Sequence, residues 1–262
     1  MDYPTSLLRK RLTSNELALC MSTTLARTAD TPMIAAAAGF DAIYIDLEHS
    51  ATSLETTSTL CSAALLSGIT PLVRVPSHDY QYMTRALDTG AMGIIVPHVN
   101  DVKTVVGIVD ACKFPPMGHR SIVGTHPSTR YLPMSPAQLV EYLNRETFIC
   151  VMVETPEAVD LADAFAAVPG VDMVLVGPYD LSAELGILGQ FRDPKFSKAM
   201  SVVAAACKRH NKVMGVAGIK DEALLAEYAA LGVRFFSAGN DAGFLSEAAK
   251  AQATKMRSIA VP

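Results

Sequence analysis

The chain has 262 residues, of which 50% are apolar and 18% are charged, and this composition excludes a largely disordered protein. The net charge of −4 and the lack of any apolar run near the roughly 18 residues of a membrane span argue against nucleic-acid or membrane partners. Five dispersed cysteines without a C-x-x-C pair, and no secretory signal in the first 21 residues, predict reduced thiols in a cytoplasmic protein.

Eight short apolar runs predict strands that are buried on both faces. In chain order they are Leu17–Ser22, Ala42–Leu47, Pro71–Val75, Gly93–His98, Phe148–Glu154, Met173–Gly177, Lys212–Ala217 and Phe235–Ala238. Helical patterns alternate with them, and the clearest are Leu54–Leu66, Tyr80–Thr89, Glu157–Ala167 and Glu222–Leu231. This alternation predicts an α/β fold, a (β/α)₈ TIM barrel in which residues 1–262 form a single domain.

Two further features bear on the architecture. A doubly wound sheet is the competing fold, but it usually has a glycine-rich turn after its first strand, and Thr23–Ala26 contains no glycine. The connection Lys113–Arg145 is rich in proline and glycine and interrupts the rhythm of strands and helices. We predict a long functional loop there, because long loops inside compact domains are usually functional.

Ionisable side chains fall at the carboxyl ends of the predicted strands, where TIM-barrel enzymes have their active sites. They are Asp46, Glu48, His49, Arg74, His98, Glu154 and Asp180. Each has an ordinary structural interpretation when taken alone, such as a helix cap or an ion pair. Because burying unpaired charge is costly, the convergence of so many at one end predicts an active site.

The types of these residues indicate the chemistry. Glu154 and Asp180 follow neighbouring strands and suit a hard divalent cation, Mg²⁺ or Mn²⁺, with Co²⁺ as an alternative. Zinc is disfavoured because no H-x-H or H-E-x-x-H motif is present. Arg74 could stabilise an oxyanion, and His49, oriented by Asp46, could transfer protons near neutral pH. Together they predict carbonyl activation and enolate chemistry.

Four segments resemble the HpcH/HpaI family of metal-dependent (class II) pyruvate aldolases, and the resemblance covers nearly the whole chain. The segments are Gly39–Ser50, Pro71–Val75, Val153–Thr155 and Gly177–Ser182. The resemblance implies a TIM barrel that assembles as a hexamer, a trimer of dimers, with the C-terminal helix exchanged between subunits. The implied reaction is reversible cleavage of a 4-hydroxy-2-keto acid to pyruvate and an aldehyde through a metal-bound pyruvate enolate.

The resemblance also implies how the substrate is held. Glu154 and Asp180 would be the metal ligands, and Arg74 would bind the keto or enolate oxygen of pyruvate. Further contacts to the substrate, mostly from the backbone, would come from Gly177, Tyr179 and Ser182.

The resemblance implies acid–base chemistry for His49, which would be supported by Asp46 and act through a metal-bound water. Glu48 would contact the residues that hold the metal and substrate, without touching the substrate itself. The sequence departs from the family at two positions. Met152 stands where many members have glutamine, and His98 stands where an apolar residue is common. Both departures could mark an altered substrate scope.

Several alternatives use the same residues. An oxaloacetate decarboxylase or a macrophomate synthase-like enzyme would form the same enolate, whereas an acyl-CoA lyase would need an added nucleotide site. A non-catalytic barrel is the remaining alternative. A Schiff-base aldolase is disfavoured because no lysine ends a predicted strand. The segment Gly118–Ser121 matches the family's region near the mouth of the active site, where we expect selectivity to be set.

Overall fold

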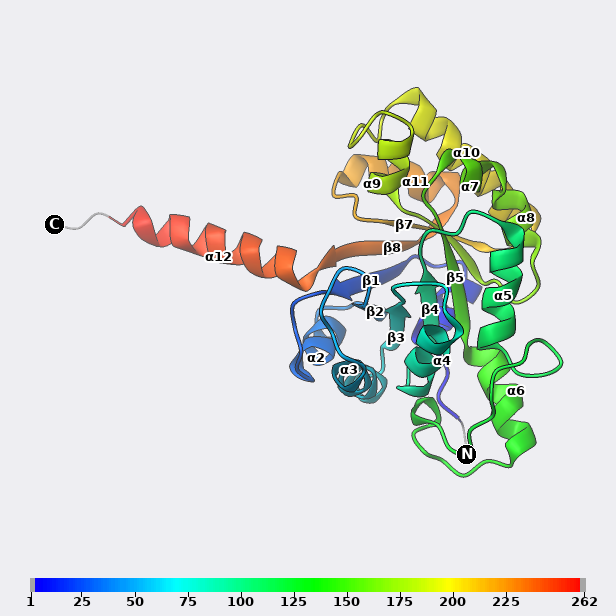
Figure 1. Cartoon of the computed structure of the whole chain (residues 1–262). Helices are drawn as coiled ribbons and strands as arrows, with labels where there is room; N and C mark the ends of the chain where they lie inside the picture. Colours follow the sequence, from blue (N-terminus) through cyan, green and yellow to red (C-terminus); the bar gives the residue numbers. More distant parts are fainter. Residues whose placement is uncertain (1–2, 260–262) are drawn as a thin grey trace.

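The computed structural model describes residues 3–259 and contains a closed barrel of eight parallel strands surrounded by helices (Figure 1). The strands pair in chain order, and β8 closes the barrel on β1. They are β1 (Ala18–Thr23), β2 (Ala42–Asp46), β3 (Thr70–Arg74), β4 (Gly93–Val96), β5 (Phe148–Val153), β6 (Met173–Val176), β7 (Val213–Ala217) and β8 (Val233–Asn240). The predicted TIM barrel is confirmed, and each predicted strand has a counterpart whose ends shift by a few residues.

The helices alternate with the strands. They are α1 (Leu7–Thr13), α2 (Asp30–Ala37), α3 (Leu54–Ser67), α4 (Tyr80–Asp88), α5 (Val102–Cys112), η1 (Pro127–Thr129), α6 (Pro136–Glu146), α7 (Pro156–Asp160), α8 (Ala162–Ala167), α9 (Pro178–Glu184), α10 (Pro194–Arg209), α11 (Glu222–Leu231) and α12 (Asp241–Arg257). The helix predicted over 157–167 is divided at Leu161 into α7 and α8. Within residues 3–259, no helix is long and apolar enough to cross a membrane.

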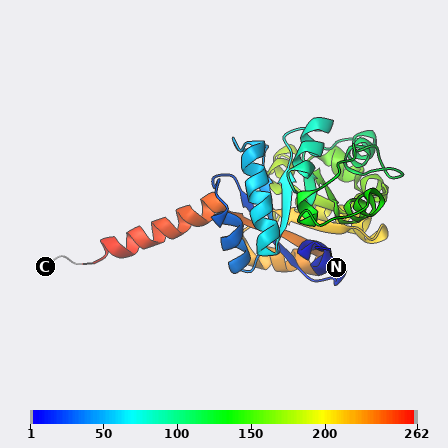
Figure 2. The same ribbon diagram turned by 90° about the horizontal axis from the view of Figure 1, so that it is seen from below.

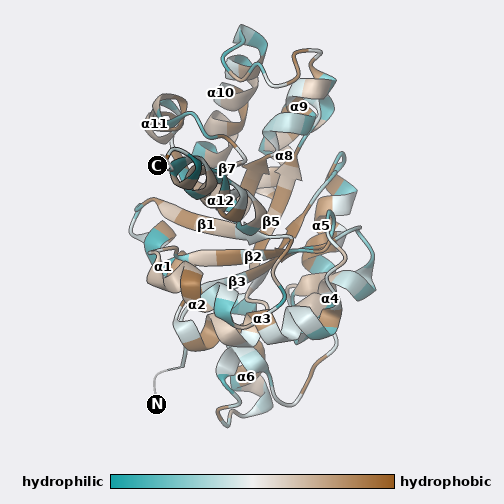
Figure 3. Cartoon of the chain, turned by 90° about the vertical axis from the view of Figure 1, so that its left-hand side faces the viewer, coloured by the Kyte–Doolittle hydropathy of each residue, from teal (hydrophilic) through white to brown (hydrophobic). Residues whose placement is uncertain are grey.

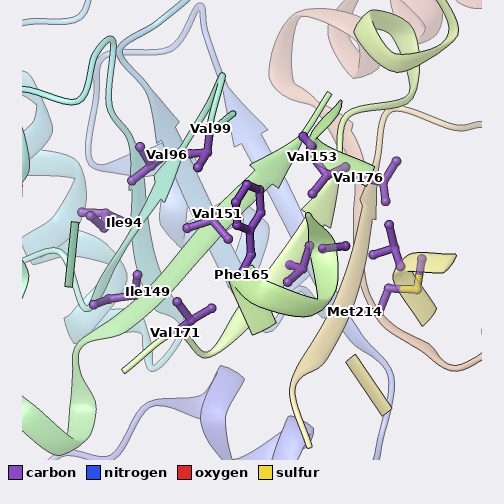
Figure 4. Close-up of a cluster of buried hydrophobic side chains, with 14 of the residues drawn as sticks. Ile94, Val96, Val99, Ile149, Val151, Val153, Phe165, Val171, Val176 and Met214 are labelled. Carbon is purple, nitrogen blue, oxygen red and sulfur yellow. The ribbon is translucent and has the colours of Figure 1, made fainter. Parts of the chain in front are cut away.

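The side chains of the strands alternate between an inner hydrophobic cluster and the outside of the barrel. Most of the outward ones join one large cluster, while Met21 and Ile43 join a smaller one. On β5, Ile149, Val151 and Val153 point outward toward the helices, where Phe165 also packs (Figure 4). Cys150 and Met152 belong to the inner cluster. Figure 3 shows the strands as the most hydrophobic part of the chain. Because side chains alternate along a strand, the residue after Val153 faces the interior at the carboxyl end of the barrel.

The connection Lys113–Arg145 lies at the amino end of the barrel, and its last part is the helix α6 (Figure 1). Helices of a β/α barrel run back from the carboxyl end, so Asp88, the last residue of α4, marks the opposite end. Arg120 donates a 2.7 Å hydrogen bond from Nη2 to Asp88 Oδ1. The expectations of a wholly irregular loop, and of Gly118–Ser121 near the mouth of this barrel, are therefore wrong.

The last helix, α12, leaves the barrel and extends away from it (Figures 1 and 2). None of its residues is buried. Its first residue, Asp241, fixes the point of departure, because its carboxylate accepts hydrogen bonds from Thr23 Oγ1 at 2.6 Å and from the Ala26 N–H at 2.7 Å. The helix is thus anchored to the end of β1 while the rest of it is exposed.

Candidate active site

A cavity of about 390 Å³ opens at the carboxyl ends of the strands. Most of the residues predicted from the sequence meet there, since the lining includes His49, Arg74, Glu154, Gly177, Tyr179 and Asp180. Four side chains with polar groups that the sequence reasoning did not select also line it, namely Ser22, Tyr44, Ser237 and Asn240. Ser22 and Ser237 could have been found from strand alternation, because each lies two residues after an inward-facing residue of β1 or β8.

Arg74 ends β3 and is held by two carboxylates. Its Nε lies 3.0 Å from Asp46 Oδ1 and its Nη2 lies 2.6 Å from Asp46 Oδ2, which is a bidentate pair. Its Nη1 lies 2.8 Å from Glu48 Oε2. Burial alone would lower the pKa of Arg74, but the hydrogen bonds to Asp46 and the neighbouring negative charges raise it above its usual value. The guanidinium is therefore a fixed cation at the wall of the cavity.

Asp46 is the last residue of β2, and its carboxylate also shapes the turn that follows. Its Oδ1 accepts hydrogen bonds from the main-chain N–H of Glu48 at 3.0 Å and of His49 at 3.3 Å. The imidazole of His49 is mostly exposed, and its Nε2 lies 3.6 Å from Glu48 Oε2. Asp46 therefore supports Arg74 and the backbone of this turn. The predicted pairing of its carboxylate with the His49 ring is wrong, because the ring faces Glu48.

Glu154 lies at the centre of the site and is almost fully buried. Its burial raises the pKa of its carboxyl group, and the nearby charges of Asp180 and Glu48 raise it further. Gly177, which precedes α9, leaves space for this side chain. A Cβ atom at Gly177 would lie only 2.7 Å from Cγ and Oε1 of Glu154. The close approach of Glu154 thus depends on glycine at that position.

His98 is brought into this site by the turn after β4. Its main-chain N–H donates a hydrogen bond to Glu154 Oε2 at 2.7 Å. Its ring Nε2 lies 2.8 Å from Glu48 Oε1, and its ring Nδ1 lies 3.5 Å from Glu154 Oε2. His98 is therefore in contact with two of the site carboxylates.

The structure corrects one of the predicted substrate contacts and limits another. Ser182 is fully buried, and its hydroxyl donates to the carbonyl of Tyr179 and accepts from the N–H of Gly189, so it does not face the cavity. The N–H of Gly177 is used by the sheet, because it donates to the carbonyl of Val153. Tyr179 does line the cavity, and its ring packs edge to face on Phe191 at 5.2 Å.

The donor set of the site fits a hard divalent cation. Among residues 3–259, no group of three or more His, Cys, Asp or Glu side chains is arranged to hold a metal. Two carboxylates, Glu154 and Asp180, suffice for Mg²⁺ or Mn²⁺, which commonly keep several waters. The pKa of Glu154 is raised mainly because its carboxyl group is buried, and a cation bound beside it would favour the charged form.

The fold and this arrangement define a TIM-barrel enzyme with its acidic and basic groups at the carboxyl end. The family model that matches the chain, over residues 24–248, is that of the HpcH/HpaI aldolase/citrate lyase family. The chain belongs to this family, and it is an aldolase-type carbon–carbon lyase.

Named relatives make the comparison more specific. A 4-hydroxy-4-methyl-2-oxoglutarate aldolase of Hapsidospora irregularis is 40% identical over 263 residues, covering 97% of this chain and 96% of that protein. A protein of the same description from Chaetomium globosum is 43% identical over 223 residues and covers 82% of each chain. The crystal structure of an HpcH/HpaI aldolase from Desulfitobacterium hafniense is 31% identical, with a TM-score of 0.90 and 97% of both chains covered.

Proposed function

We propose that the protein cleaves a 4-hydroxy-2-oxo acid between C3 and C4, releasing pyruvate and a carbonyl compound, with residues 1–262 as one catalytic domain. The observation that carries this proposal is the meeting of a paired arginine, Arg74, with the carboxylates Glu154 and Asp180 around one cavity. Cleavage of the C3–C4 bond leaves its electron pair in the enolate of pyruvate, so a negative charge must be stabilised on the keto oxygen.

Arg74 is the residue that we assign to this charge. A divalent cation held by Glu154 and Asp180 would supply Lewis acidity at the same oxygen. Because Asp46 and Glu48 hold the guanidinium in place before the substrate arrives, little reorganisation accompanies the reaction. The first-turn N–H groups of Tyr179 and Asp180 have no acceptor within α9, and we assign them to the substrate carboxylate.

His49 is the residue that we assign to proton transfer. The 4-hydroxyl group must lose a proton as the C3–C4 bond breaks, and C3 of the enolate must then gain one. The exposed ring of His49 lines the cavity on the solvent side, where it can exchange protons with water.

The substrate that we favour within this class is 4-hydroxy-4-methyl-2-oxoglutarate, because two relatives at 40% and 43% identity are described as aldolases for it. Its cleavage balances as two molecules of pyruvate. One leaves as the enolate and is protonated at C3, and the other leaves as the ketone formed from C4 and its methyl and carboxyl groups.

The test is metal-dependent release of pyruvate from a panel of 4-hydroxy-2-oxo acids, with oxaloacetate included. We expect chelation to abolish release and added Mg²⁺ or Mn²⁺ to restore it. Glu154→Gln and Asp180→Asn should lose both activity and stabilisation by metal, whereas Glu184→Gln, an exposed change on the same helix as Asp180, should retain both. Release from oxaloacetate alone would refute the aldolase proposal in favour of a decarboxylase.

We also propose that the protein is an intracellular homo-oligomer, a hexamer built as a trimer of dimers, with α12 packed on a neighbouring subunit. The exposed apolar residues of this otherwise uncovered helix, Phe244, Leu245 and Met256, support the packing, and five free, buried cysteines support a reducing compartment. Sedimentation should give a mass of six chains, and Leu245→Glu should reduce it. A parent protein that sediments as a monomer would contradict the assembly.

A further inference from the structure

His98 makes two contacts that come from different parts of the residue. It follows β4 and Pro97 and has a φ of +54°, a left-handed conformation that is uncommon outside glycine. This conformation directs its main-chain N–H to Glu154 Oε2 at 2.7 Å. Its ring lies nearest to a different carboxylate, with Nε2 at 2.8 Å from Glu48 Oε1, while Nδ1 is farther from Glu154 Oε2, at 3.5 Å. The backbone and the side chain of one residue therefore hold two acids of the site.

Glu48 is the link between this ring and the reacting groups. Its side chain is mostly buried, and its second oxygen, Oε2, lies 2.8 Å from Arg74 Nη1 and 3.6 Å from His49 Nε2. The imidazole of His98 lies within ion-pair distance of one oxygen of this carboxylate, and Arg74 lies within ion-pair distance of the other, Oε2, which is buried and accepts no hydrogen bond from residues 3–259. Without the ring, the carboxylate is free to rotate about its last bond, and the contact with Arg74 loses its fixed direction.

We propose that His98 is a positioning residue with two separable functions. Its main-chain N–H orients Glu154, and its imidazole orients Glu48 and, through Glu48, the guanidinium of Arg74. The activity measurements below rest on the proposed aldolase function, whereas the stability measurements do not.

Glycine at position 98 separates the two functions. His98→Gly keeps the main-chain N–H and is compatible with the left-handed backbone, so the contact to Glu154 is retained while the ring is removed. We expect kcat to fall by roughly ten-fold to a hundred-fold, the usual cost of losing a partner that orients a site group. The affinity for Mn²⁺, measured by calorimetry, should stay within about three-fold of the parent, because the main-chain hydrogen bond to Glu154 at 2.7 Å is kept and only the longer approach of the ring, at 3.5 Å, is lost.

A second variant tests whether the ring acts as a hydrogen-bond donor. His98→Gln places an amide NH₂ group near the position of Nε2, so it should recover part of the lost kcat. His119→Gln, an exposed histidine in the connection at the other end of the barrel, is the control and should match the parent. Equal kcat for the parent and His98→Gly would overturn the proposal, as would a glutamine variant no better than glycine. A parallel loss of Mn²⁺ affinity would show that the ring acts on Glu154 instead.

A stability cycle tests the contact apart from the reaction. We expect the shifts in Tm of His98→Gly and Glu48→Gln to be non-additive in the double variant, because both remove one interaction. Additive shifts would overturn the proposal even if the parent released no pyruvate. If the parent protein released no pyruvate but the Tm shifts were non-additive, the proposed function would be refuted and the positioning contact would be supported.

Discussion

The substitution Gly177→Ala tests the geometry around Glu154 most directly. Gly177 has φ −92° and ψ 95°, which alanine can adopt, so the cost comes from space rather than from backbone strain. The added methyl group would lie 2.7 Å from Cγ and Oε1 of Glu154 and 3.1 Å from Cδ, well inside van der Waals contact. Since Glu154 is buried, its carboxylate must move away from the place where it faces Asp180.

The expected magnitude follows from overpacking, which typically costs about 1–3 kcal/mol. For a domain of this size that corresponds to a fall in Tm of roughly 2–12 °C. Mn²⁺ at a hundred times its Kd should stabilise the parent by about 2.7 kcal/mol, and a site ten-fold weaker would keep about 1.4 kcal/mol of this at the same concentration. Thermal unfolding with and without Mn²⁺ measures both effects.

A matched glycine provides the control. Gly107 lies inside α5, and a Cβ atom there would meet nothing within 4 Å, so Gly107→Ala should stabilise the protein by roughly 0.5–1 kcal/mol. If Gly177→Ala bound Mn²⁺ as tightly as the parent and unfolded at the same temperature, the reasoning about Glu154 would be refuted.

Three further predictions concern other parts of the molecule. Arg74→Lys keeps a charge but loses the bidentate fork to Asp46, so kcat should fall by at least about ten-fold and by at most the roughly 10²–10³ that complete loss of an oxyanion donor costs. Unchanged kcat would exclude the role. Burial is the main cause that lowers the pKa of His126 to about 4, and the charge of Arg120 lowers it further. As the pH falls from about 6.5 to 4, this histidine is therefore protonated in the unfolded chain but not in the folded protein. Stability should decline across that window by up to roughly 3 kcal/mol, less so in His126→Asn, and an identical decline in both proteins would contradict this. The five cysteines are free and buried, so a thiol reagent should react only on unfolding, and fast labelling of the native protein would count against the fold at those positions.

Much of the fold was readable because the barrel repeats one local rule. Strands that are buried on both faces are continuous apolar runs, so the sequence predicts all eight of them. Glycine or proline residues mark the ends of several helices between the strands. The division of the helix at Leu161 and the presence of α6 were missed. The proline-rich composition of the connection suggested irregular structure, but Ser135 begins α6 with a capping box and Pro136 occupies its first turn.

The sequence predicts which side chains lie at the carboxyl ends of the strands, but not which of them pair with one another. Position along a strand placed Arg74, Glu154 and Asp180 at one end of the barrel, but it could not say which acid pairs with which base. Asp46 and Arg74 lie opposite one another in the β2–β3 register, and this pairing across strands decided the partner of Asp46. Sequence neighbours had favoured His49 instead. The hydroxyl of Ser182 was misjudged because helix α9 turns it away from the cavity.

Asn240 belongs to two parts of the molecule at once. It lines the cavity, and its side chain begins α12 by accepting a hydrogen bond from the N–H of Gly243 at 2.7 Å. The next residue, Asp241, ties the same junction to β1. A change in the orientation of α12 would therefore displace Asn240 at the rim of the cavity. If neighbouring subunits hold that helix, diluting the enzyme should alter turnover per chain before it alters folding, so that protein concentration itself becomes a variable of the reaction.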